Sequence, residues 1–126
     1  MIYEVDYTRH HPENGHHEII AILTGLPIEE IRAVASDKQV WHSRMYLQAF
    51  KQLGFNVNPR FVKWDPSTPY PCMMRFKRID MKESYWHALA YNNGKVFPGN
   101  GEWWWLESFT KVNPHLKITS MLQVWI

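Results

Sequence analysis

The stretch Trp86–Phe97 reads WHALAYNNGKVF and contains the clearest local signal of structure in the chain. An apolar run, Trp86–Tyr91, and a second run, Lys95–Phe97, flank the segment Asn92-Asn93-Gly94. Asparagine and glycine tolerate the positive backbone φ angles that a tight hairpin turn requires. The stretch therefore predicts two antiparallel strands joined by a short turn.

Other strand-like segments surround this hairpin in the C-terminal part of the chain. They are short, rich in apolar residues and separated by turns that contain proline or glycine. The candidates are Phe55–Val57, Arg60–Trp64, Cys72–Phe76 and Ile118–Trp125. Short consecutive strands favour antiparallel pairing, so residues of about 55–126 predict a mostly antiparallel sheet of about five strands.

The N-terminal part, of about residues 1–54, has a helical pattern instead. A first helix is expected to begin near His16 and to end at Gly25, since glycine is a common C-terminal stop. A second helix follows from Pro27, which suits a first helical turn. A third begins with a capping pattern at Ser36 and ends before Gly54. Together these segments predict one α+β domain, with helices packed on the sheet.

Composition narrows the class of protein. The chain has 126 residues, enough for one domain, and its 45% hydrophobic and 21% charged residues are typical of a globular protein. The formal net charge of +2 is too small to indicate a nucleic-acid or membrane partner. One cysteine excludes an intramolecular disulfide and a multi-thiolate zinc site. Without a spanning apolar run or a signal peptide, a cytoplasmic location is expected.

Two segments, Glu13–Glu30 and Tyr85–Phe97, resemble small papain-like cysteine peptidases of the bacteriocin-processing type, including compact versions common in bacteriophages. The resemblance implies a papain-like fold over about residues 8–100. In that family, the catalytic cysteine begins the first buried helix and the catalytic histidine opens a later strand. The resemblance therefore also implies where catalytic residues should stand in this chain.

These catalytic positions are largely replaced. The nucleophile position falls on Gly15, or on His16 if the alignment shifts by one residue. His87 matches the catalytic histidine, and Asn100 is the polar residue nearest to the position of the family's Asp or Asn. Without a thiol, His87 has only water to deprotonate. We therefore expect a pseudoenzyme without a cofactor, used as a virion component, an assembly factor or an inhibitor of a host process.

An active hydrolase of the same fold is the alternative. The only thiol, Cys72, is expected to be a buried strand residue, but it is also a candidate for a relocated nucleophile beside His87. A second possibility is a metal held by His16 and His87, with neighbouring histidines His10 and His11 in the entry loop.

Three consecutive tryptophans, Trp103, Trp104 and Trp105, form the most unusual segment. Neighbouring residues of a strand or helix point in different directions, so at least one indole should be exposed or should cover an edge. Large exposed aromatics are typical of protein interfaces. We expect a partner-binding surface formed by these residues and the former cleft, which comprises Gly15, His16, His87 and Asn100. The partner would be a second copy, or a virion or host protein.

A nucleic-acid-binding module is a further alternative. Basic residues alternate with apolar ones in the strand-rich part, namely Arg60, Lys63, Arg75, Lys77, Arg78 and Lys82. A basic stripe flanked by aromatics is able to follow a phosphate backbone. However, a solvated sheet face protected by Lys and Arg has the same pattern, so we expect no nucleic-acid partner.

Overall fold

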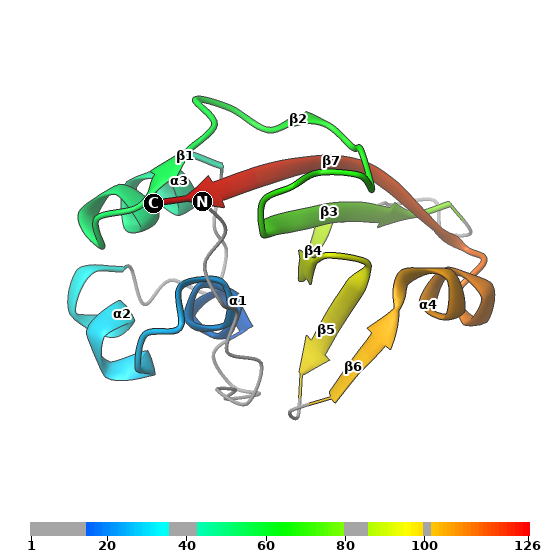
Figure 1. The fold of residues 1–126 in the computed structure, drawn as a ribbon, viewed down its shortest axis with the longest axis horizontal. Coiled ribbons are helices and arrows are strands. Elements are labelled where there is room, and N and C mark those ends of the chain that lie inside the picture. The colour runs from blue at the N-terminus through cyan, green and yellow to red at the C-terminus, as the bar shows by residue number, and fades with distance from the viewer. Residues whose placement is uncertain (1–14, 36–42, 80–85, 100–101) are drawn as a thin grey trace.

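The computed structural model describes residues 15–35, 43–79, 86–99 and 102–126. Within them, four helices accompany one antiparallel sheet of seven strands, which confirms the α+β class (Figure 1). The sheet is larger than the expected five strands. The sequence did not predict the strand at Glu102–Trp105 or the helix at Leu106–Val112.

The helices are α1 (Gly15–Thr24), α2 (Ile28–Val34), α3 (Ser43–Gln52) and α4 (Leu106–Val112). The first three confirm the order of the predicted helices. Gly25, with a φ of 72°, ends α1 in the left-handed conformation that glycine adopts without strain. The capping pattern at Ser36 lies outside the described residues.

The strands are β1 (Asn56–Val57), β2 (Val62–Lys63), β3 (Cys72–Arg78), β4 (Trp86–Asn92), β5 (Lys95–Gly99), β6 (Glu102–Trp105) and β7 (Leu116–Trp125). Their order in the sheet is β1-β7-β3-β4-β5-β6, and β2 also pairs with β7. The last strand of the chain therefore lies inside the sheet, whereas β6 lies at its end (Figure 1).

The predicted hairpin is present as β4 and β5. Tyr91 pairs with Val96, and Asn92 with Lys95, around a turn in which Asn93 and Gly94 have φ values of 50° and 85°. The carbonyl oxygen of Gly94 accepts a hydrogen bond of 2.8 Å from the backbone N–H of Leu106. The turn thus also fixes the start of α4.

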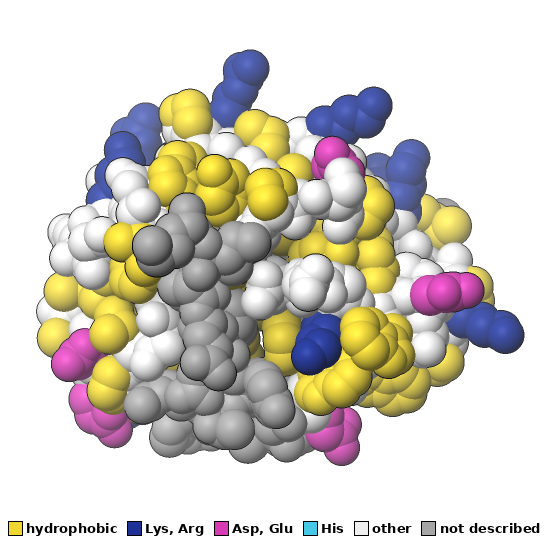
Figure 2. Space-filling view, viewed as in Figure 1, with side chains coloured by type: hydrophobic (Ala, Val, Ile, Leu, Met, Phe, Trp, Pro, Cys, Tyr) yellow, Lys and Arg dark blue, Asp and Glu magenta, His cyan; other side chains and the backbone are white. Residues whose placement is uncertain are grey.

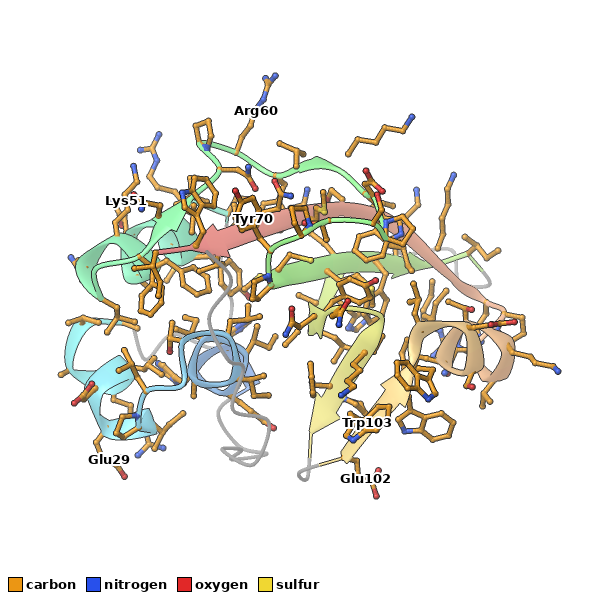
Figure 3. All side chains as sticks on the ribbon, in the orientation of Figure 1. Glu29, Lys51, Arg60, Tyr70, Glu102 and Trp103 are labelled. Atoms are coloured by element: carbon orange, nitrogen blue, oxygen red, sulfur yellow. The ribbon has the colours of Figure 1, made fainter. Side chains whose placement is uncertain are left out.

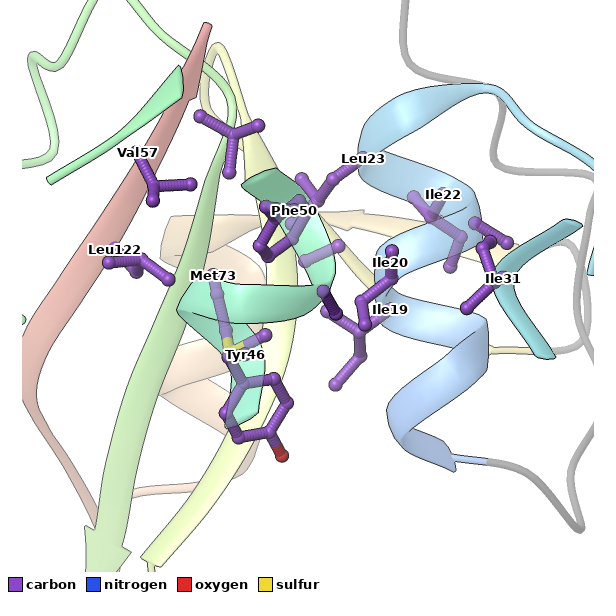
Figure 4. Close-up of a cluster of buried hydrophobic side chains, with 14 of the residues drawn as sticks. Ile19, Ile20, Ile22, Leu23, Ile31, Tyr46, Phe50, Val57, Met73 and Leu122 are labelled. Atoms are coloured by element: carbon purple, nitrogen blue, oxygen red, sulfur yellow. The ribbon is translucent and has the colours of Figure 1, made fainter. Parts of the chain in front are cut away.

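Helices α1 and α3 pack on one face of the sheet, and α2 packs against these two helices; the larger apolar core lies among them (Figure 4). Ile20 and Leu23 of α1 and Phe50 of α3 are completely buried there. The sheet contributes Met73 of β3 and Leu122 of β7. This amphipathic packing, rather than the intrinsic helix propensity of such short segments, stabilises the helical layer.

The other face carries a second core beneath α4. It contains Cys72, Met74 and Phe76 of β3, against which Leu106 and Phe109 of α4 pack. Successive residues of a strand point to opposite faces, so β3 is apolar on both sides. The sequence did not predict α4 because its seven residues are too few to establish a helical period.

The substitution Gly94→Ala should destabilise the protein by about 1–2 kcal/mol, because a side chain strains the backbone at a positive φ. The added Cβ would lie 3.7 Å from the ring of Trp105, an ordinary contact, so a clash adds little. Urea denaturation measures the loss. The control Asn93→Gly, at the other positive φ, should leave stability nearly unchanged; an equal loss in both variants would contradict this account.

Candidate functional site

Cys72 and His87, the candidate catalytic pair, are not brought together. On the paired strands β3 and β4, Cys72 lies opposite Tyr91, whereas His87 lies opposite Phe76. Phe76 follows Cys72 by four positions, which places the two candidates about 13 Å apart along the sheet. A nucleophile and its base must be within hydrogen-bond reach. The alternative of a Cys72/His87 hydrolase therefore does not fit the structure.

The environment of Cys72 also opposes reactivity. Its side chain is completely buried in the core beneath α4, and this burial raises the pKa of the thiol. Cys72 begins strand β3, so it does not stand at the helix N-terminus that lowers the pKa of many catalytic thiols. Because the thiolate is the reactive form, Cys72 acts as a small apolar residue, as the sequence suggested.

His87 lies on the opposite face of the sheet from α1. Its exposed ring stacks on Phe76, with ring centroids 5.7 Å apart, and Phe76 belongs to the core beneath α4. The neighbouring Ala88 packs instead on the core formed with α1. The expected cleft of Gly15, His16 and His87 is therefore not assembled, because α1 and His87 lie on opposite faces of the sheet, and this arrangement does not support a metal held by His16 and His87.

The remaining site predictions concern residues that are not described. Asn100, His10, His11 and Lys82 lie outside the described ranges. Among the residues that the structure does describe, no group of three or more His, Cys, Asp or Glu side chains is arranged to hold a metal ion.

The start of α1 carries a different polar arrangement, which the sequence did not reveal. The half-buried ring of His16 shares a hydrogen bond through Nδ1 with the hydroxyl group of Tyr46 on α3, and the two rings meet edge to face. Thirty residues separate the two along the chain. The sequence gives no local signal of this hydrogen bond, because Tyr46 also fits the apolar face of α3 and is explained by helix packing alone.

Arg75 of β3 completes this arrangement. Its Nε atom donates a hydrogen bond of 3.0 Å to Ser120 of β7, and an Nη1–H donates one of 3.3 Å to Ser43. The guanidinium carbon lies 4.1 Å from the ring centre of Phe61. We call His16, Tyr46 and Arg75 the polar bridge, since they connect α1, α3 and β3.

The phenol of Tyr46 in the polar bridge is not an effective nucleophile. Burial raises the pKa of Tyr46 to about 12, although the positive charge of Arg75 acts in the opposite direction. The phenol is therefore neutral near pH 7 and serves as a hydrogen-bonding group. The resemblance places a catalytic thiol at Gly15 or His16. At this position the chain has the polar bridge, which connects α1, α3 and β3.

The three tryptophans form β6, the strand at the end of the sheet. Trp104 lies opposite Val96 and Trp105 opposite Lys95 on β5. Trp103 and Trp105 share a face, with ring centroids 4.9 Å apart at 85°, and the Lys95 ammonium lies 4.6 Å from the Trp103 ring. Trp104 points to the other face, as strand alternation requires.

This edge is exposed. Trp104 and Trp105 are 39% and 53% accessible, which confirms that at least one indole of the triplet is not in the core. Trp103 is half-buried against the core shared with α1. In Figure 2, hydrophobic side chains gather over β6 beside a basic one, and Figure 3 labels Trp103 and Glu102 there. Within the described part of the chain, no strand pairs with the outer side of β6. We call β6 and its three indoles the tryptophan edge.

Among the described basic residues, Arg60, Arg75, Lys77 and Arg78 do not lie on one common face. Arg75 is engaged in the polar bridge, and Lys77 and Arg78 point to opposite faces of β3. Arg60 lies on the side of the molecule away from Trp103 (Figure 3).

Neither a scan against family models nor a search of curated proteins matches this chain. Within the described ranges, every helix is too short or too polar to cross a lipid bilayer.

The thiol of Cys72 should resist alkylation in the folded protein, because it is fully buried and its pKa is raised. Iodoacetamide at neutral pH, followed by mass spectrometry, measures the modified fraction. Modification should become rapid in concentrated urea, which serves as the positive control. Rapid labelling of the native protein would show that Cys72 is accessible and would contradict its role as a core residue.

The raised pKa of Tyr46 predicts a stability contribution that is fully present below pH 10 and is lost between pH 10 and about 12. In that window, the free energy of unfolding should fall by up to about 1.4 kcal/mol per pH unit more steeply than in Tyr46→Phe. At neutral pH, that variant should lose about 1 kcal/mol with the hydrogen bond to His16. Parallel pH profiles for the two proteins would disprove the burial of this phenol.

Proposed function

We propose that this chain is a non-catalytic protein-binding domain that captures an extended segment of a partner by adding it as a strand beside β6. The observation that carries the proposal is the tryptophan edge, where Trp104 and Trp105 are exposed on a strand that lies at the end of the sheet.

The backbone of β6 supplies the general part of such binding. An end strand presents N–H and C=O groups that pair readily with another extended chain. Proteins that avoid such pairing place lysine or proline on the edge strand, but β6 consists of Glu102 and three tryptophans. Its composition therefore favours strand addition.

The indoles supply the remaining affinity and the specificity. Because β6 has four residues, backbone hydrogen bonds alone would form a small interface. Tryptophan offers a large apolar surface with little loss of conformational entropy and is frequent at binding hot spots. Trp103 and Trp105 contact one side of an added strand and Trp104 contacts the other, so the partner needs apolar residues on both faces.

The separation of Cys72 and His87, the candidate pair among the described residues, supports the non-catalytic part of the proposal. The single thiol is buried, and His87 points away from α1. On the resemblance to small papain-like peptidases, we propose a degenerate peptidase fold retained for its surface. The same resemblance suggests a phage protein that acts in a virion, in assembly or against a host process.

A displayed library of short random peptides tests the proposal. Wild-type protein should select extended, aromatic or branched sequences, and these should shift the backbone amide resonances of β6 and protect them from hydrogen exchange. The variant Trp104→Lys should weaken binding by at least tenfold, because it removes a hot-spot indole and protects the edge.

Ile79→Lys is the matched control, because Ile79 is an exposed apolar residue, 62% accessible, just beyond β3. This variant should bind as the wild type does. Failure to select any peptide, or selection of peptides that bind Trp104→Lys equally well, would refute the proposed function. Circular dichroism verifies that each variant is folded.

A further inference from the structure

We infer that the tryptophan edge is a self-complementary interface, at which β6 of one copy pairs antiparallel with β6 of a second copy across a two-fold axis at Trp104. This inference rests on the proposed function, since it names the strand that is added to the edge. It follows from the pleat of β6, the positions of the three indoles and the charges nearby.

Symmetry restricts the register. When two copies of β6 pair antiparallel, the two-fold axis that relates them is perpendicular to the sheet. The same face of each copy therefore lies on the same side of the joined sheet. A residue on one face must then lie opposite a residue on that same face. Trp103 and Trp105 share a face, whereas Trp104 occupies the other. The axis must therefore pass through a residue of β6, and not between two residues.

Only one of the three tryptophans suits that axis. An axis at Trp105 would pair residues of α4, which are helical and unable to form a ladder. An axis at Trp103 would place Trp104 opposite the partner's Glu102 and Trp105 opposite residue 101, outside β6. An axis at Trp104 places Trp103 opposite the partner's Trp105 and Trp104 opposite its own counterpart. All indoles then lie in cross-strand aromatic pairs, which are favourable in antiparallel sheets.

The charges are compatible with this register. Glu102 falls beside the partner's Leu106, the first residue of α4, so the ladder comprises Trp103–Trp105 of each copy and the two Glu102 carboxylates do not face each other. Each Lys95 ammonium already lies over indole rings of its own chain, 4.6 Å from the Trp103 ring and 5.8 Å from the Trp105 ring. The two Lys95 residues would stand on β5 strands three strand spacings apart, about 14 Å, which exceeds the screening length of about 8 Å. The two Lys95 ammonium groups therefore do not oppose association.

This geometry favours a second copy over an unrelated segment as the occupant. An extended peptide must present suitable apolar groups on both of its faces, and β6 itself meets that need in the register required by symmetry. The resulting contact is isologous and closes as a dimer, so it leaves no further exposed edge at this end of the sheet.

Sedimentation velocity over a wide concentration range tests the association. Wild type should shift from monomer to dimer as concentration rises, whereas Trp104→Lys should remain monomeric. Ile79→Lys should behave as the wild type. Hydrogen exchange of the wild-type dimer should show added protection of β6.

Disulfide trapping tests the register in a Cys72→Ala background. Trp104→Cys should form a disulfide-linked dimer on mild oxidation, because the residue faces its own counterpart. Trp103→Cys alone should not form a disulfide-linked dimer. A mixture of Trp103→Cys and Trp105→Cys should form one, because these two positions lie opposite each other in the proposed register. Efficient crosslinking of Trp103→Cys by itself would overturn the Trp104 register.

The two proposals fail separately. A wild-type protein that stays monomeric at every concentration, yet binds selected peptides at β6, would overturn the self-pairing and leave the proposed function standing. A dimer that persists in Trp104→Lys would also overturn the self-pairing, because the contact would then lie elsewhere. A monomer that selects no peptide would overturn both. Peptides that bind β6 should dissociate the dimer, since they occupy the same edge.

Discussion

The alternation of side chains along the paired strands β3 and β4 is the constraint on which the other features depend. Cys72 and Tyr91 share the face beneath α4, whereas Met73 and Ala90 share the face beneath α1. A slip of β4 by one residue would reverse every side chain and turn His87 toward α1. Tyr91 opposes that slip: it is fully buried, meets the Trp64 ring edge to face, and donates a hydrogen bond of 2.7 Å to the carbonyl oxygen of Pro66.

This register separates the chemistry of the two faces. His87 is held on the side of α4, whereas Ala88 packs on the core formed with α1, and the polar bridge of His16, Tyr46 and Arg75 lies at the start of α1. A catalytic site needs a nucleophile and a base on one face, but here the thiol and the exposed imidazole are four positions apart and the phenol is held neutral. Strand register thus keeps Cys72 and His87 apart, in addition to the replacement of the cysteine position that the resemblance implies.

The sequence predicted those parts of the fold that have local signals. Asn93-Gly94 specified the hairpin, and Gly25 and Gly54 marked where helices end. The face to which His87 points was not predictable, because it depends on the pairing of β4 with a distant strand. The polar bridge was missed for the same reason, since Tyr46 and Arg75 each fit an ordinary amphipathic pattern. Strand β6 was missed because three consecutive bulky aromatics show no alternation of polar and apolar residues.

The two ends of the sheet differ in the segments of the chain that cover them. At one end, β7 pairs with β1 and β2, and Asn58 fixes the neighbouring loop through hydrogen bonds with Gln123, including one of 2.6 Å from the Gln123 backbone N–H. At the other end, α4 begins directly after Trp105 and packs on the face of the sheet, not along its edge. The chain therefore closes one end with its own short strands and places its most hydrophobic edge at the other. In the proposed self-pairing, β6 is its own geometric complement, and a second copy would cover those indoles without any further sequence.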